Sequence, residues 1–311
     1  MPKFFGSIAA AIAVTVAAVT PAQALSQRTF VASTGLDTNP CSLPLPCRTF
    51  GAAIAGTSSG GEVVILDSAG YGPVSISKSI SITAPPGIYA GISVLSGVGI
   101  TVSATGAIVK LSGLTINGQG GTTGVYMTTS GYLVLENCII SNFAGTNYVG
   151  IYVTGPASVT VTDSKILNNY YGAYFDGGST GEIAHSLILG NTQEGVHVNG
   201  SAVAAGTGVA IEDSEVSQNY IGLNAVSTIA SSRANIAIIR SQIFTNIYGA
   251  ASQSTAGTSY VTMTASFLMG NVTGLYQYQA GGSATVESFG DNSAQFDTTP
   301  LLGTLTTRQH F

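Results

Sequence analysis

The chain has 311 residues and a net charge of −5, and charged residues make up only 7% of it, where about a quarter is ordinary. Glycine is abundant, with 40 residues, and tryptophan is absent. Such a weakly acidic composition argues against nucleic-acid binding, because that function depends on clustered Lys and Arg side chains that neutralise phosphates.

Residues 1–24 are predicted to be a signal peptide. Lys3 is followed by a nearly continuous apolar run from Ile8 to Val19 and then by Ala22-Gln23-Ala24. The run is too short to span a bilayer comfortably, and signal peptidase recognises an A-x-A sequence. We therefore expect a secreted or periplasmic mature chain that begins near Leu25. We expect no membrane span, because no later segment is apolar for long enough.

Residues 25–60 are predicted to form an amino-terminal cap. They contain the strand-like sequence RTFVAS, a turn-rich GLDTNPC and a short helix candidate at Phe50 to Ala55. Cys41 and Cys47 flank SLPLP, and in an oxidising compartment a disulfide between them is favoured over two free thiols. Cys138 lies in the apolar sequence VLENCII and is expected to be a core residue.

Residues 61–292 contain an internal repeat. An Asn anchor returns every 22 to 28 residues, preceded by a Ser and followed by a Gly and a short apolar segment. Three short strands per repeat, divided by Ser, Asn and Gly corners, predict one triangular coil with no room for a helix. Asn side chains at one corner of stacked coils can hydrogen-bond along the stack as a ladder. The predicted ladder comprises Asn142, Asn169, Asn191, Asn219, Asn246 and Asn271.

From Gly61 to Asn292 the repeat, in the form xSx(I/L)xxNxxxGφxφ, resembles the pectin-lyase-like, right-handed parallel β-helix superfamily. The resemblance implies an all-β, three-sheet solenoid of about nine to ten coils with a short amino-terminal helical cap. Residues 293–311 drift out of the pattern and are predicted to be a tail that covers the last coil. Caps are needed because the terminal strands of a solenoid are otherwise exposed edges.

Alternation along the strands predicts an exposed outward stripe. Because successive side chains point to opposite faces, the second residue after each repeat Gly points outward. These residues are Tyr126, Tyr152, Tyr174, His197 and Asn224, and Asp176 and Asn199 occupy the next outward position. Aromatic rings beside Asp, His and Asn suit the apolar faces and hydroxyls of sugars, although such rings can also stabilise a sheet without any ligand.

Members of the superfamily commonly bind polysaccharide along an outward sheet face, so the leading hypothesis is polysaccharide binding with little or no catalysis. The alternative is a polysaccharide lyase or a related enzyme with Asp176 and His197 as an acid–base pair. Lyases of this fold usually require an Arg or Lys base and acidic residues that hold calcium, and no basic residue occupies the stripe. We expect no cofactor, with calcium relevant only to a lyase. A third hypothesis is a structural or adhesive module, and the oligomeric state is open.

A second polar column precedes the repeat serines. It comprises Glu136, Asp163, His185, Asp213 and Arg240. The column could bind a metal or an acidic sugar, but polar corner residues are also the ordinary means of keeping a solenoid soluble. The latter interpretation is favoured.

Overall fold

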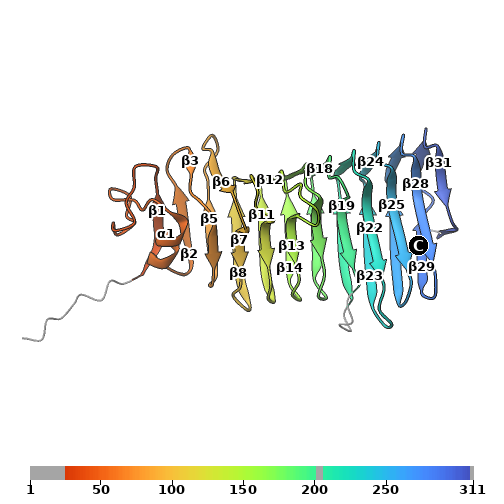
Figure 1. Ribbon diagram of the computed structural model, residues 1–311, viewed down its shortest axis with the longest axis horizontal. Coiled ribbons are helices and arrows are strands. Elements are labelled where there is room, and N and C mark those ends of the chain that lie inside the picture. The colour runs from red at the N-terminus through yellow and green to blue at the C-terminus, as the bar shows by residue number, and fades with distance from the viewer. Residues whose placement is uncertain (1–24, 201–205, 309–311) are drawn as a thin grey trace, which may run out of the picture.

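The computed structural model describes residues 25–200 and 206–308, so the predicted signal peptide lies outside the described residues. The described chain is a right-handed parallel β-solenoid of about nine turns. Figure 1 shows a long stack of coils that runs from the amino-terminal to the carboxy-terminal end. Among the described residues, no helix is both long and apolar enough to cross a membrane.

Each complete coil contributes one strand to each of three sheets, and every described pairing between strands is parallel. Sheet A contains 12 strands: β1 (Ser26–Val31), β2 (Thr57–Ile65), β5 (Ile80–Thr83), β8 (Ala107–Ser112), β11 (Gly131–Glu136), β14 (Ser158–Thr162), β17 (Thr180–Ala184), β20 (Thr207–Glu212), β23 (Arg233–Ile239), β26 (Thr258–Thr264), β29 (Ser283–Ser288) and β32 (Leu305–Thr307).

Sheets B and C contain ten strands each. Sheet B is built from β3 (Ala69–Gly70), β6 (Ala90–Val94), β9 (Leu114–Gly118), β12 (Ile139–Ser141), β15 (Lys165–Leu167), β18 (Leu187–Leu189), β21 (Glu215–Ser217), β24 (Gln242–Phe244), β27 (Phe267–Met269) and β30 (Ser293–Gln295). Sheet C is built from β4 (Val74–Ile76), β7 (Val98–Val102), β10 (Thr123–Met127), β13 (Val149–Val153), β16 (Tyr171–Phe175), β19 (Glu194–Asn199), β22 (Ile221–Ser227), β25 (Tyr248–Ser254), β28 (Thr273–Gln279) and β31 (Thr299–Leu302).

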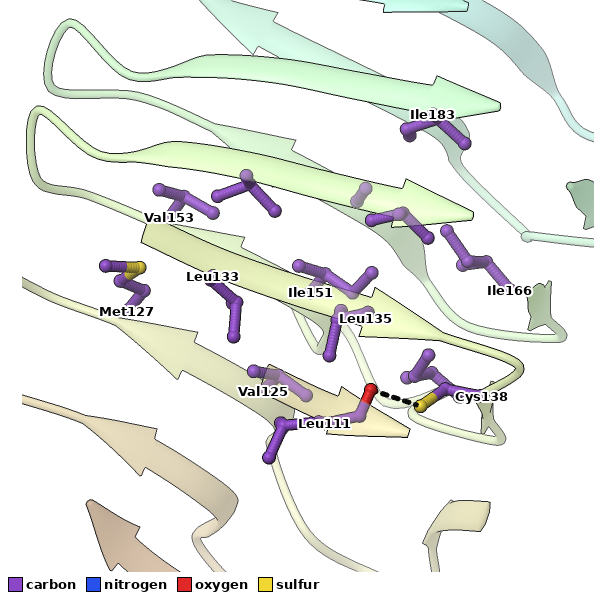
Figure 2. Close-up of a cluster of buried hydrophobic side chains, with 14 of the residues drawn as sticks. Leu111, Val125, Met127, Leu133, Leu135, Cys138, Ile151, Val153, Ile166 and Ile183 are labelled. Carbon is purple, nitrogen blue, oxygen red and sulfur yellow. Dashed lines mark hydrogen bonds between the residues drawn. The ribbon is translucent and has the colours of Figure 1, made fainter. Parts of the chain in front are cut away.

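The hydrophobic core fills the inside of the coil along its length. Figure 2 shows part of it, where aliphatic side chains from the three sheets meet around Leu135 and Ile151. Cys138, expected to be a core residue, is buried here as a free thiol, and its Sγ contacts the carbonyl oxygen of Leu111 at 3.5 Å. Inward-facing aliphatic residues alternate with polar outward ones, which is the pattern that a closed solenoid requires.

The amino-terminal end carries the single described helix, α1 (Phe50–Gly56). Thr49 is its N-cap, since Oγ1 of Thr49 accepts from the backbone N–H of Ala52. Within the helix, the side chains of Phe50 and Ile54 are buried. Cys41 and Cys47 form a disulfide in the preceding loop, with their Cα atoms 4.6 Å apart.

The carboxy-terminal residues, expected to cover the last coil, form strands of their own. Residues 293–302 and 305–307 add β30, β31 and β32 to the three sheets, so they form one more coil. Phe296 is 84% exposed at its corner. Although the repeat phrase is lost in this segment, the backbone hydrogen bonds of the preceding coil still direct it into parallel pairing.

Candidate functional site

The outward stripe predicted from the repeat lies on sheet C, in the middle of the stack. Tyr126, Tyr152, Tyr174, His197 and Asn224 are consecutive register partners across β10, β13, β16, β19 and β22. Neighbouring strands are about 4.8 Å apart, so the five side chains form one row along the solenoid.

The aromatic members of this row contact one another in an unbroken series. The rings of Tyr126 and Tyr152 stack with centroids 5.2 Å apart, and Tyr152 meets Tyr174 edge to face at 5.3 Å. Tyr174 then stacks on the imidazole of His197 at 4.2 Å. Tyr171 closes the cluster from the side, because its ring meets those of Tyr174 and His197 edge to face.

This packing raises the pKa of three phenols, with burial as the first cause in each; for Tyr152 the neighbouring Tyr126 and the Asp176 carboxylate add to it. Burial, together with the charge of Glu194, raises the pKa of Tyr171 to about 12. Burial and the nearby Asp176 carboxylate raise the pKa of Tyr174 well above its ordinary value. All three phenols therefore remain neutral donors at any physiological pH.

The stripe is less exposed than its sequence predicts. The three tyrosines are half-buried, but His197 is only 9% exposed and Asn224 only 3%. The cause is the packing around these two side chains: the rings of Tyr171 and Tyr174 contact His197, and Glu194 hydrogen-bonds to both His197 and Asn224. Glu194 directly precedes the repeat Gly and lies beside the stripe.

Glu194 organises a buried polar network on the outside of sheet C. Its Oε2 lies 2.6 Å from Nδ1 of His197, and its Oε1 accepts from Nδ2 of Asn224 at 3.0 Å. Oδ1 of Asn224 accepts in turn from Gln253 at 2.9 Å. Glu194 is 5% exposed, and both of its carboxyl oxygens have partners within the protein. The repeat phrase does not predict this role for Glu194; the available signal is its position directly before the repeat Gly, where Tyr171 and Tyr248 also stand.

Asp176 and His197, the predicted acid–base pair, form no hydrogen bond or ion pair with each other. One oxygen of Asp176 accepts from the backbone N–H of Gly177 at 2.6 Å and the other from Nδ2 of Asn199 at 3.3 Å. His197 takes its carboxylate partner from Glu194, three residues earlier in the same strand. A carboxylate on Nδ1 fixes the imidazole orientation and leaves Nε2 as the group that could exchange a proton with a ligand.

Two hydrogen-bonded ladders hold the corners on either side of sheet B. In the first, the backbone N–H and Nδ2 of each Asn donate to Oδ1 of the next, from Asn169 through Asn191, Asn219 and Asn246 to Asn271. In the second, the backbone N–H of each repeat Ser donates to the hydroxyl of the next, from Ser164 to Ser266.

Asn142 is not a member of the Asn ladder for which the sequence predicted it. Phe143 occupies that position, since its backbone N–H donates to Oδ1 of Asn169 at 3.1 Å. Asn142 lies one residue earlier, exposed and left-handed with a φ of 66°, and donates to Asn117 instead. At the other end the ladder finishes on Asp297, whose Oδ1 accepts from both nitrogens of Asn271. Sequence analysis did not identify Asp297.

The second polar column lies at the corner between sheets A and B. Asp163, His185, Asp213 and Arg240 all have φ between 46° and 50°, but their equivalent in the preceding coil is Asn137, not Glu136. Glu136 is a strand residue paired with Thr162. Arg240 binds Asp213 at 2.8 and 2.9 Å, so these charges are paired with each other. No group of three or more His, Cys, Asp or Glu side chains in residues 25–200 and 206–308 is arranged to hold a metal ion.

A concavity of about 410 Å³, not predicted from the repeat, lies on the outer face of sheet A. Its lining residues come from β23, β26, β29 and the segment after β32: Arg233, Asn235, Ile236, Ala237, Tyr260, Thr262, Glu287 and Arg308. Alternation along β26 was the available signal, because Val261 and Met263 are buried and Tyr260 and Thr262 must then face outward.

A family model and a solved structure match this architecture. Residues 97–286 match the family described as the right handed beta helix region. The crystal structure of pectate lyase Pel9A is similar, with a TM-score of 0.60 and 17% sequence identity over 91% of this chain and 83% of that one. A rhamnogalacturonan lyase structure reaches a TM-score of 0.35 at 12% identity, over 80% and 72% of the two chains. No curated protein sequence matches. The family match covers more than half of the chain, and the protein therefore belongs to the right-handed β-helix family.

Proposed function

We propose that this protein binds extracellular polysaccharide along the outward face of sheet C, with little or no catalysis. The proposed contact residues are Tyr126, Tyr152, Tyr174, His197, Asn199 and Asn224. The observation that carries the proposal is the unbroken series of ring contacts from Tyr126 to His197. We propose further that the protein acts outside the cytoplasm, as a secreted or periplasmic protein.

The chemistry of the face suits a polymer of sugars. Adjacent coils present amphipathic side chains at intervals of about 4.8 Å, so a chain laid along the solenoid meets the same kind of group repeatedly. The rings are rigid because each is held by its neighbours, which lowers the entropy lost on binding. Asp176 and Asn199 are half-buried beside the row and supply hydrogen-bonding groups for hydroxyls.

Affinity electrophoresis through gels containing neutral or acidic polysaccharides tests the proposal. Tyr152→Ala and Tyr174→Ala should reduce retention, whereas Tyr89→Ala, which removes a 51% exposed tyrosine away from sheet C, should not. Tyr174→Phe keeps the packing and separates a lost hydroxyl contact from a disturbed fold. Equal retention of all four variants and the wild type would reject sheet C as the binding face.

A second candidate is a polysaccharide lyase or a related carbohydrate-active enzyme. The 2.6 Å contact between Glu194 and His197 favours it, because it orients the imidazole. In this hypothesis His197 handles the proton, Asp176 is a nearby carboxylate, and calcium is a candidate requirement. Unsaturated uronate product that disappears in His197→Ala would establish this candidate. Neither product nor retention would favour a structural or adhesive module.

We propose that α1 caps the amino-terminal end of the solenoid. It packs on β1, β2 and β4, and its Phe50 ring lies 5.2 Å from that of Tyr71. Phe50→Ala should therefore destabilise the protein by about 3–5 kcal/mol, the usual cost of removing a fully buried aromatic ring.

Amino-terminal sequencing of the exported protein tests the proposed cleavage after Ala24.

A further inference from the structure

We propose that the concavity on sheet A binds an anionic saccharide, one that carries carboxylate or sulfate groups. This site is separate from the stripe on sheet C and does not depend on it. Arg233 would bind the anionic group, Tyr260 would support the sugar ring, and Asn235 and Thr262 would bind hydroxyls. These four side chains come from two adjacent strands, in which Asn235 pairs with Tyr260 and Ala237 with Thr262.

Arg233 is a cation without a partner inside the described protein. It is exposed at the first residue of β23 and forms no ion pair or side-chain hydrogen bond with another described residue. Arg28, Lys110, Arg240 and Arg308, by contrast, are all in ion pairs. Because the protein has a net charge of −5, an unpaired guanidinium at the rim of a concavity is a specific local attraction for anions.

Tyr260 differs from the tyrosines of sheet C. The rings of Tyr126, Tyr152 and Tyr174 are turned to one another, whereas Tyr260 has no aromatic neighbour among the described residues. It is half-buried and lines the concavity. Its ring can therefore contact the apolar face of a sugar bound there. Ala237, beside it, leaves room for a ligand to approach the sheet.

The carboxylate within the concavity is already neutralised. Glu287, 8% exposed, would repel an anion if it were unpaired. Arg308 lies over it, with Nη2 3.0 Å from Oε1 of Glu287, and the Arg308 side chain remains 60% exposed. The concavity thus contains two guanidinium groups and one carboxylate, so its net charge is positive. A planar guanidinium can bind a carboxylate or a sulfate through two parallel hydrogen bonds.

Binding to three polymers with one backbone tests the site. Dextran, carboxymethyl dextran and dextran sulfate differ in their charged groups and not in their sugar, so they separate charge recognition from general sugar binding. We expect wild-type protein to bind one or both charged polymers at least tenfold more tightly than dextran at low salt, and to lose that preference as salt rises. Whichever charged polymer binds identifies the anionic group.

The decisive variant is Arg233→Gln, with Lys165→Gln as its matched control. Lys165 is also exposed, begins strand β15 and has no ion pair among the described residues, but it lies on sheet B. Arg233→Gln should weaken binding of the charged polymer about tenfold or more, and Lys165→Gln less than twofold. Equal losses in the two variants, or no preference for charged polymers in the wild type, would overturn the proposal.

Further variants separate the site from folding and from the stripe. Tyr260→Ala should weaken binding, whereas Tyr132→Ala, which removes a 59% exposed tyrosine elsewhere on sheet A, should not. Tyr278→Ala, which removes a 43% exposed tyrosine from β28 of sheet C, should leave the preference for charged over neutral dextran unchanged. If Tyr152→Ala alone removes that preference, the anionic site is not on sheet A. Thermal unfolding of each variant confirms that it is folded before binding is compared.

Discussion

Removing one amide from the Asn ladder gives a quantitative test of what holds the coils together. Asn219 lies in the middle of the ladder and is 3% exposed. Its Oδ1 accepts from the backbone N–H and Nδ2 of Asn191, both at 2.9 Å, and its Nδ2 donates to Asn246 at 3.0 Å. Asn219→Ala deletes these side-chain contacts and leaves the buried N–H of Asn191 without an acceptor.

The expected loss of stability follows from these contacts. An orphaned buried donor costs about 1–3 kcal/mol, and each hydrogen bond removed is worth about 1 kcal/mol net. Part of the loss is offset, because Nδ2 of Asn191 also contacts the carbonyl oxygen of Ile166 at 3.4 Å and the backbone N–H of Asn219 still donates to Asn246 at 2.9 Å. We therefore expect the free energy of unfolding to fall by about 2–4 kcal/mol.

Guanidinium unfolding, checked for reversibility, measures this change. Asn142→Gly is the control, because Asn142 follows the same sequence phrase but lies outside the ladder, and glycine accepts its φ of 66°. It should change the free energy of unfolding by no more than about 1 kcal/mol. If the two substitutions cost the same, buried amide contacts between coils are not what the ladder contributes.

Three other residues give independent tests. Glu194→Ala should lower the free energy of unfolding by about 3–5 kcal/mol, because it leaves the buried groups of His197 and Asn224 unpaired; an unchanged denaturation midpoint would contradict the network. Tyr171 has a pKa of about 12 in the folded protein against 10.0 ordinarily, so the unfolded state loses its proton first and stability should fall as pH rises from about 10 to 12. Tyr171→Phe should make denaturation midpoints less sensitive to pH across that interval. Cys138, whose thiol pKa is raised by burial to about 11, should react with a thiol reagent only after unfolding, whereas rapid labelling of the native protein would show that the coil opens there.

The architecture could be predicted from the sequence because each coil repeats the same pattern of residues. A left-handed corner, a buried Ser or Asn and an inward aliphatic residue recur in register, and parallel pairing carries that register through the stack. The row from Tyr126 to Asn224 was identified for this reason. Asn142 was misplaced because Asn is favoured both in the ladder and in the left-handed position before it.

The details of the site could not be predicted, because they depend on side chains that meet from different coils. Burial of His197 depends on the rings of Tyr171 and Tyr174 and on the carboxylate of Glu194. Arg233 and Arg308 both line the concavity on sheet A. They lie 75 residues apart in the sequence and share this site only because the chain coils. Periodicity gives the direction of each side chain but not which neighbour will cover it.

The most direct test of polysaccharide binding is affinity electrophoresis of the purified mature protein against neutral and acidic polysaccharides, with absorbance of unsaturated uronate read from the same mixtures. Calcium and a chelator are compared in parallel. We predict retention by at least one polysaccharide without product, reduced in Tyr152→Ala and Tyr174→Ala. Product formation that requires His197 would contradict a noncatalytic role, and the absence of both retention and product would contradict polysaccharide binding itself.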